Sequence, residues 1–205
     1  MASILKVDTI QDQSGNNIIN ENANTVTIGK SGDTVNVVGT LQNGGTNFLQ
    51  GITEADQWKL TTSLTNPGGS DTTITANLER VDEPTFAKIG TGMTESSGVF
   101  SFPSTGLYCV NYKISTSSTT DFHEAYIYVT SDGGSTYNKT TQTFGGHNVS
   151  GLLYQEAFSQ ALINVTNISN IKVKFNIAGL TVGSVLGAPT VSRTAFTFIR
   201  LGDSQ

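Results

Sequence analysis

Alternating apolar and polar residues run through most of the chain beyond residue 72, and this pattern predicts strands rather than helices. A period of two recurs over residues 108–114, 171–177 and 194–201, so each of these segments can bury one face. Residues 125–129 are apolar or aromatic on both faces, which predicts a central strand of a sheet.

Short turn motifs separate the predicted strands. Pro103 cannot donate a ladder hydrogen bond and belongs at a strand end, while Gly106 allows the chain to turn sharply. Asp132-Gly-Gly134 predicts a hairpin, residues 115–120 an exposed Ser/Thr loop, and residues 179–189 a long Gly-rich loop. About eight strands with such punctuation predict an all-β fold of the sandwich or jelly-roll type.

Residues 1–50 have a different character. Short, thinly apolar strands are predicted over 4–10, 24–29 and 34–39, and no aromatic residue precedes Phe48. Such an arm buries too little surface to offset an ordering entropy of about 1–2 kcal/mol per residue. We therefore expect it to dock on another surface or to intertwine with copies of itself; a floppy N-terminal tail is the alternative.

A linker is predicted between the arm and the main domain, over residues 51–65. Residues 52–60 are predicted to form a short helix, because Thr53 can cap its first turn. Trp58, the only tryptophan, is expected to staple the arm to the main domain, with a glycan-stacking platform as the alternative. The main domain is then expected over residues 66–205.

Composition and charge narrow the function classes. Hydrophobic residues make up 36% and charged residues only 13% of the chain, which disfavours disorder. The modest apolar content suggests that neighbouring subunits supply part of the core. The net charge is −5 and there is no basic run, so no nucleic-acid partner is expected. The apolar runs are shorter than a membrane span, and the first residues lack the pattern of a signal peptide, so no membrane partner is expected.

Few residues could carry chemistry. Cys109 is the only cysteine, which excludes an intrachain disulfide, and we predict a buried, inert thiol. His123 could bind a metal or shuttle protons with Asp121, but a hydrogen-bonded loop or edge histidine is the prediction. His147 follows two glycines and is predicted to lie in a loop.

Catalytic motifs are not found either. There is no Gly-x-Ser-x-Gly elbow, and Gly90-Thr-Gly92 lacks the rest of a phosphate-binding pattern. Asp82 and Glu83 are neighbours in a predicted turn and would need a distant partner to act as glycosidase carboxylates. We therefore expect that the protein is not an enzyme, with no catalytic residue, no metal site and no cofactor.

The segment Phe-Ser-Phe-Pro-Ser-Thr-Gly-Leu-Tyr at 100–108 resembles the central signature of the C1q/TNF-like jelly rolls. Residues 194–201 are similar to the last core strand of that family, and residues 77–98 lie where it has its early strands. The resemblance covers residues 66–205 and implies a jelly-roll sandwich and a homotrimer rather than a chemistry. The aromatic residues expected to divide between the monomer core and the trimer axis are Phe100, Phe102, Tyr108, Tyr112, Phe175, Phe196 and Phe198.

The arm carries a second resemblance. Leu5–Gln11 and Ser14–Ile18 resemble N-terminal segments of virion structural proteins from tailed phages, especially those of marine and cyanobacterial hosts. This implies a protein made in the host cytoplasm and placed on the particle surface, with residues 1–50 binding the major capsid protein or a tail adaptor.

Head decoration or cement protein is therefore the expected function. The alternatives are a short tail fibre or spike that binds a host surface glycan, and a free-standing carbohydrate-binding module. The loops at 115–120 and 179–190 contain no aromatic residue on which a sugar could stack, which favours the structural role.

Overall fold

The computed structural model describes most of the chain after residue 50 and short pieces before it, namely residues 37–39, 42–43, 46–47, 51–82, 84, 86–119, 122–146 and 151–205. The chain divides into two compact units, Met1–Leu49 and Gln50–Gln205. In the first unit, β1 (Gln42–Asn43) pairs with β2 (Thr46–Asn47) in antiparallel fashion. The strands predicted over 4–10 and 24–29 lie outside the described residues.

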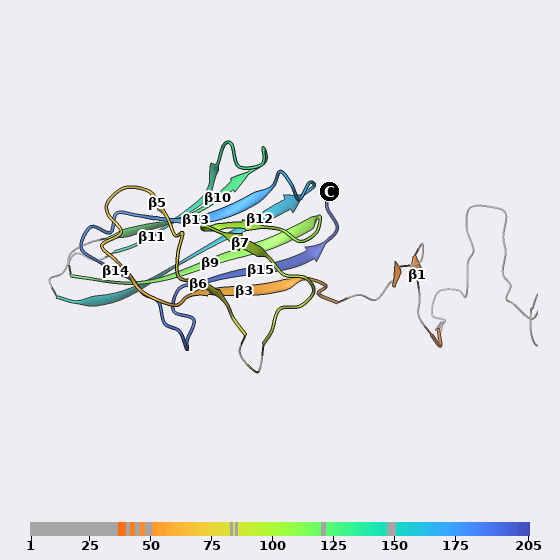
Figure 1. The fold of residues 1–205 in the computed structure, drawn as a ribbon, viewed down its shortest axis with the longest axis horizontal. Helices are drawn as coiled ribbons and strands as arrows, with labels where there is room; N and C mark the ends of the chain where they lie inside the picture. The colour runs from red at the N-terminus through yellow and green to blue at the C-terminus, as the bar shows by residue number, and fades with distance from the viewer. Residues whose placement is uncertain are drawn as a thin grey trace, which may run out of the picture. The chain divides into compact units, whose positions relative to one another are not determined.

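The second unit is a sandwich of two antiparallel sheets (Figure 1). One, here the β10 sheet, runs in the order β11-β10-β13-β8-β7, with β5 beside β13. Its strands are β5 (Thr72–Thr73), β7 (Thr94–Ser96), β8 (Val99–Ser101), β10 (His123–Thr130), β11 (Asn138–Gly145) and β13 (Lys172–Ala178).

The other sheet, here the β9 sheet, runs in the order β4-β14-β9-β15-β3-β6, and β12 pairs with β9 along its whole length. Its strands are β3 (Ala55–Leu60), β4 (Leu64–Thr65), β6 (Leu78–Arg80), β9 (Gly106–Ser118), β12 (Leu153–Val165), β14 (Gly183–Val185) and β15 (Ala195–Gly202). No helix occurs in the described part of the chain, so the all-β prediction is confirmed.

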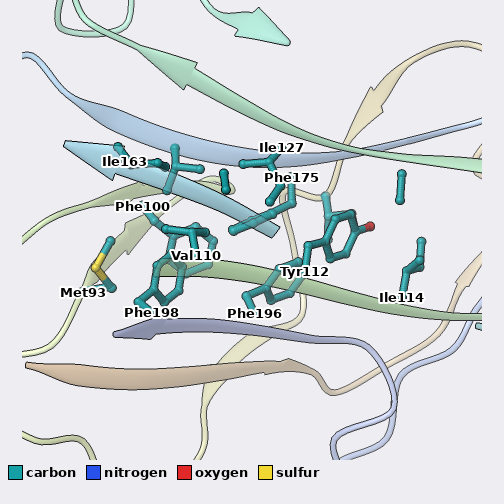
Figure 2. Close-up of a cluster of buried hydrophobic side chains, with 14 of the residues drawn as sticks. Met93, Phe100, Val110, Tyr112, Ile114, Ile127, Ile163, Phe175, Phe196 and Phe198 are labelled. Atoms are coloured by element: carbon teal, nitrogen blue, oxygen red, sulfur yellow. The ribbon is translucent and has the colours of Figure 1, made fainter. Parts of the chain in front are cut away.

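The core lies between the two sheets and is built from aromatic rings (Figure 2). Phe175 of β13 lies 4.5 Å from Phe196 of β15 and 5.2 Å from Tyr112 of β9, measured between ring centroids. These separations are in the range of favourable aromatic pairs. The predicted one-face burial of residues 108–114 and 171–177 is confirmed, as is the central position of β10 between β11 and β13.

The predicted corner between two strands is also confirmed. Strand β8 ends before Pro103, and β9 begins at Gly106, whose φ is 151°. A Cβ atom at Gly106 would lie 2.4 Å from Arg200 Nε and 2.7 Å from the Gly202 carbonyl oxygen. Only glycine allows the chain to turn here while it lies directly against β15.

The helix predicted over residues 52–60 is wrong. Residues 55–60 form strand β3, which pairs with β15 on one side and β6 on the other. The Glu54 carboxylate accepts hydrogen bonds from the backbone N–H groups of Thr91 (3.1 Å) and Gly92 (3.0 Å). Because so short a helix is marginal in water, pairing with distant strands overrides the local preference.

Trp58 belongs to the sandwich and not to a linker, which corrects the predicted staple. Its ring meets Phe100 edge-to-face at 5.4 Å, and the Arg80 guanidinium lies 4.8 Å from its centroid. The indole N–H donates to Asp56 Oδ2 at 2.9 Å, and Arg80 Nε approaches Asp56 Oδ1 at 3.0 Å. The compact unit thus begins before the boundary predicted at residue 66.

Three strand boundaries also differ from the prediction. Strand β9 continues to Ser118, well into the loop predicted over residues 115–120. Residues 73–78, in the alternating region beyond residue 72, do not form one continuous strand, and Asn77 has a φ of 60° there. The loop predicted over 179–189 contains β14. In β9 and β14, polar residues pair with a neighbouring strand. At Asn77, one residue turns the chain. Neither feature changes the hydrophobic period, so the sequence pattern does not reveal it.

Candidate functional site

Strand β12 presents its larger apolar side chains to the outside. Ala157, Ser159 and Ala161 point into the sandwich and are buried. Phe158 and Leu162 lie on the opposite face and are 57% and 63% exposed. A strand on the surface of a globular domain normally has the reverse arrangement, with large apolar residues inside and polar residues outside.

The inward positions of β12 are small because its neighbour fills the space. In the antiparallel register, Ser159 lies opposite Tyr112 of β9, and Ala161 lies opposite Val110. Tyr112 and Val110 are both fully buried. Large inward side chains on both strands would exceed the volume between the sheets, since protein interiors are close-packed.

An apolar stripe crosses the sheet from β12. Leu162 lies opposite Cys109 of β9, and Cys109 lies opposite Ile199 of β15. Exposed Tyr154 of β12 and Leu201 of β15 extend the same side of the sheet. We define the β12 face as the outward side chains of Tyr154, Phe158, Leu162, Cys109, Ile199 and Leu201. Large apolar side chains gathered on one outer face favour a contact site there.

The polar groups among these side chains are mutually paired. Gln160 donates through Nε2 to Asn111 Oδ1 at 2.8 Å. Lys113 Nζ lies 3.5 Å from Glu156 Oε1, and the Ser115 hydroxyl donates to the same oxygen at 3.0 Å. The exposed ion pair adds little stability but leaves the face without net charge. Another protein surface can therefore cover the β12 face without burying an unpaired charge.

Cys109 lies on the β12 face, so the predicted burial in the core is wrong. Its side chain is half-buried, and its Sγ lies 3.6 Å from Asn111 Oδ1. Burial raises the pKa of the Cys109 thiol, and the hydrogen bonds to Gln160 and Asn111 oppose that shift less strongly. The thiol is protonated at neutral pH and is a poor nucleophile.

His123 is more deeply buried than predicted. It begins β10, an interior strand, and its side chain is inaccessible to solvent. Its Nδ1 pairs with the Thr116 hydroxyl at 3.1 Å, whereas Nε2 has no hydrogen-bond partner among the described residues. Burial lowers the pKa of His123 to about 4, which keeps the ring neutral at physiological pH. Asp121 and His147 lie outside the described residues.

The structure does not bring the other candidate residues together into a chemical site. Asp82 is exposed, and Glu83 lies outside the described residues. Within the described ranges, no three His, Cys, Asp or Glu side chains are placed to hold a metal ion. In the same ranges there is no helix long and apolar enough to span a membrane.

The seven aromatic residues expected to divide between core and trimer axis are not divided. All of them are buried inside the sandwich of a single chain: Phe100, Phe102, Tyr108, Tyr112, Phe175, Phe196 and Phe198. The exposed apolar residues are a different set, and Leu153, Tyr154, Phe158 and Leu162 of that set lie on β12. The available indication was the segment 154–162, in which Tyr154, Phe158 and Leu162 share one face and alanine and serine lie on the other.

Comparison with known proteins identifies the fold and nothing finer. No family model and no curated protein matches the chain. Murine APRIL at pH 8.0 superposes with a TM-score of 0.51 at 12% identity, covering 72% of this chain and 98% of that one. The Eiger TNF of S. frugiperda superposes with a TM-score of 0.51 at 10% identity, covering 74% and 94%. The sandwich is a TNF-like jelly roll, as the resemblance of residues 100–108 implied.

Proposed function

We propose that this chain is the subunit of a homotrimeric surface protein of a tailed-phage virion, most simply a head decoration or cement protein. The observation that carries the trimer is the outward placement of Phe158 and Leu162 on β12. The virion context is supported by the resemblance of residues 5–18 to phage structural proteins.

Association through the β12 face would remove the exposed apolar side chains from water. Burying one Phe or Leu side chain fully contributes about 1.5–3 kcal/mol. A stable interface buries roughly 800 Å² on each partner, which a sheet face of three strands can supply. The C1q/TNF-like resemblance implies closure around a three-fold axis, and a closed ring leaves no copy of the face uncovered.

Light scattering on the purified chain tests the trimer. We expect three times the chain mass of 21.7 kDa for the native protein. Leu162→Ser should shift it towards the monomer, because Leu162 lies in the apolar stripe. Ile168→Ser is the matched control, since Ile168 is also an exposed aliphatic residue but lies in the turn after β12. A native monomer, or a fully trimeric Leu162→Ser protein, would contradict the proposal.

The arm is proposed to attach the trimer to the particle, through the major capsid protein or a tail adaptor. A chain without residues 1–50 should still form a folded trimer, because the compact unit starts at Gln50. It should be missing from assembled particles, as judged by gel analysis of purified virions. Normal incorporation of the truncated chain would show that residues 1–50 do not attach the trimer to the particle.

A glycan-binding spike is the second candidate function. The observation that favours it is a hollow on the β10 sheet, which is lined by an aromatic ring and a lysine. The loops at 115–120 and 179–190 do not favour it, since they contain no aromatic residue.

A further inference from the structure

The outward face of the β10 sheet carries tyrosines and lysines in contact. Lys139 Nζ lies 3.4 Å from the ring centroid of Tyr126. Lys174 Nζ lies 5.4 Å from the ring of Tyr128 and 4.5 Å from that of Tyr137. These are cation–π distances, and the contacts hold the long lysine side chains against the sheet.

A hollow of about 420 Å³ opens beside these side chains. Val99 and Ser101 of β8 and Lys172 of β13 line it from the sheet, and Tyr137 lines it from the loop before β11. Glu95 of β7 also lines the hollow. Its volume lies within the range of small-molecule sites, and it combines an apolar surface with a few polar groups.

Internal hydrogen bonds fix the loop that forms one wall. The Asp132 carboxylate accepts from the Thr136 backbone N–H at 2.9 Å and from the Thr130 hydroxyl at 2.6 Å. These bonds lower the pKa of Asp132 to about 2, so the carboxylate stays charged. Gly133 donates its N–H to the Asn170 carbonyl at 3.0 Å. A ligand would meet a wall that is already ordered, which reduces the entropy cost of binding.

Lys172 lines the hollow and Lys174 contacts the Tyr137 ring beside it, while Glu95 places a carboxylate in the same lining. Lys172 Nζ donates to the Gly133 carbonyl at 3.0 Å, and Lys174 contacts only aromatic rings. Among the described residues, neither ammonium group is paired with a carboxylate. The Glu95 carboxylate is already engaged, since it accepts from the Gly98 N–H at 2.6 Å.

We infer that this hollow binds a saccharide that carries an anionic group. The ring of Tyr137 would contact the apolar face of a sugar, the Ser101 hydroxyl would pair with its hydroxyl groups, and Lys172 would pair with its anion. This goes beyond the structural role proposed above. The hollow lies on the β10 sheet and the β12 face on the β9 sheet, so the two proposals concern different surfaces of the subunit.

Titration of the ¹⁵N-labelled full chain with tri-galacturonate, followed by TROSY NMR, tests the inference. We expect a Kd of about 1 mM or tighter, with the largest shifts at the amides of Gly133, Gly134 and Tyr137. Tyr137→Ala and Lys172→Gln should each weaken binding at least ten-fold. Tyr154→Ala is the matched control, because Tyr154 is an exposed tyrosine of the β12 face and its loss should leave binding unchanged.

Several outcomes would overturn the inference. These are no shift at saturating tri-galacturonate, equal binding of its uncharged methyl ester, or unchanged binding by both Lys172→Gln and Tyr137→Ala. Equal shifts with inorganic sulfate would show an adventitious ion only. Light scattering on the same samples separates the two proposals, since a monomeric chain that binds the sugar contradicts the trimer and leaves the site intact.

Discussion

Both faces of the β9 sheet carry large apolar side chains, yet only those of one face are covered within the chain. On the inner face, Tyr112 stacks on Phe196 at 5.2 Å between centroids, and both rings are fully buried. On the outer face, Phe158 and Leu162 remain largely exposed. The same period-two alternation therefore serves two different contacts, one inside the subunit and one that we assign to a neighbouring subunit. Substitutions on the two faces should differ in size and in their dependence on protein concentration.

Removal of a core ring should have the largest effect. Phe196→Ala should lower the free energy of unfolding by about 3–5 kcal/mol, because the ring contacts Phe100, Tyr112 and Phe175 and its loss leaves a cavity. Denaturant unfolding followed by near-ultraviolet circular dichroism measures this loss. The loss should be the same at every protein concentration, since the ring lies inside one subunit.

Phe158→Ala on the outer face is the matched control for Phe196→Ala. Its effect on the melting temperature should shrink as the protein is diluted towards free subunits, because the contact of Phe158 exists only in the associated state, which mass action favours at high concentration. A concentration-independent loss as large as that of Phe196→Ala would mean that Phe158 belongs to the core of the subunit. The outer face would then not be a subunit interface, and the two faces would not differ as we propose.

Acid should lower the stability of the sandwich through His123, which is buried inside it. Since its pKa is about 4 when folded and about 6.5 when unfolded, the unfolded chain binds the proton first as the pH falls. Stability is therefore full above pH 6.5 and declines below it, by about 2 kcal/mol at pH 5 and about 3 kcal/mol at pH 4. Burial is the cause, and no charged neighbour contributes to the shift.

The pH experiment compares the native chain with His123→Gln, which cannot titrate in this range. Denaturant unfolding at pH 7 and pH 5 should show a steep loss for the native chain and a shallower one for the variant. Parallel losses in the two proteins would assign the acid sensitivity to carboxylates instead of to His123.

The sequence predicts the strands best where one face alone is apolar. Strand β13 is recognisable from Val173, Phe175 and Ile177 because lysine and asparagine separate them. Strand β3 is not, because Ala55–Leu60 carries its core contacts at Trp58 and Leu60 within a sequence whose local preference is helical. Its pairing with β15 depends on residues some 140 positions away, and local propensity contains no information about them.

The candidate site was harder to predict than the fold. Aromatic residues were expected at the trimer axis, but the sequence cannot distinguish Phe196 from Phe158, since both occupy alternating positions in a strand. The difference depends on what lies opposite: Ser159 and Ala161 can be small only because Tyr112 and Val110 fill the space beside them. The hollow beside Tyr137 likewise combines three strands and a loop that are distant in sequence.

The smallest effect on stability should come from removing one hydroxyl oxygen, that of Tyr112, from the inner face of the β9 sheet. The Tyr112 hydroxyl is buried and has no hydrogen-bond partner among the described residues, and burial raises the pKa of this phenol. Tyr112→Phe should therefore leave stability unchanged or raise it by about 1 kcal/mol, because it removes an unsatisfied polar group without altering the ring.

Tyr108→Phe is the matched comparison, four residues earlier on the same face of β9. The Tyr108 hydroxyl lies 2.8 Å from Ser104 Oγ and donates to the Ser104 carbonyl at 3.1 Å. Its removal should lower stability by about 1 kcal/mol, since it breaks bonds that already exist. Thermal unfolding of the two variants side by side decides the point. If Tyr112→Phe lost as much as Tyr108→Phe, the Tyr112 hydroxyl would have to be paired in solution, and the inner face would hold bound water between its aromatic rings.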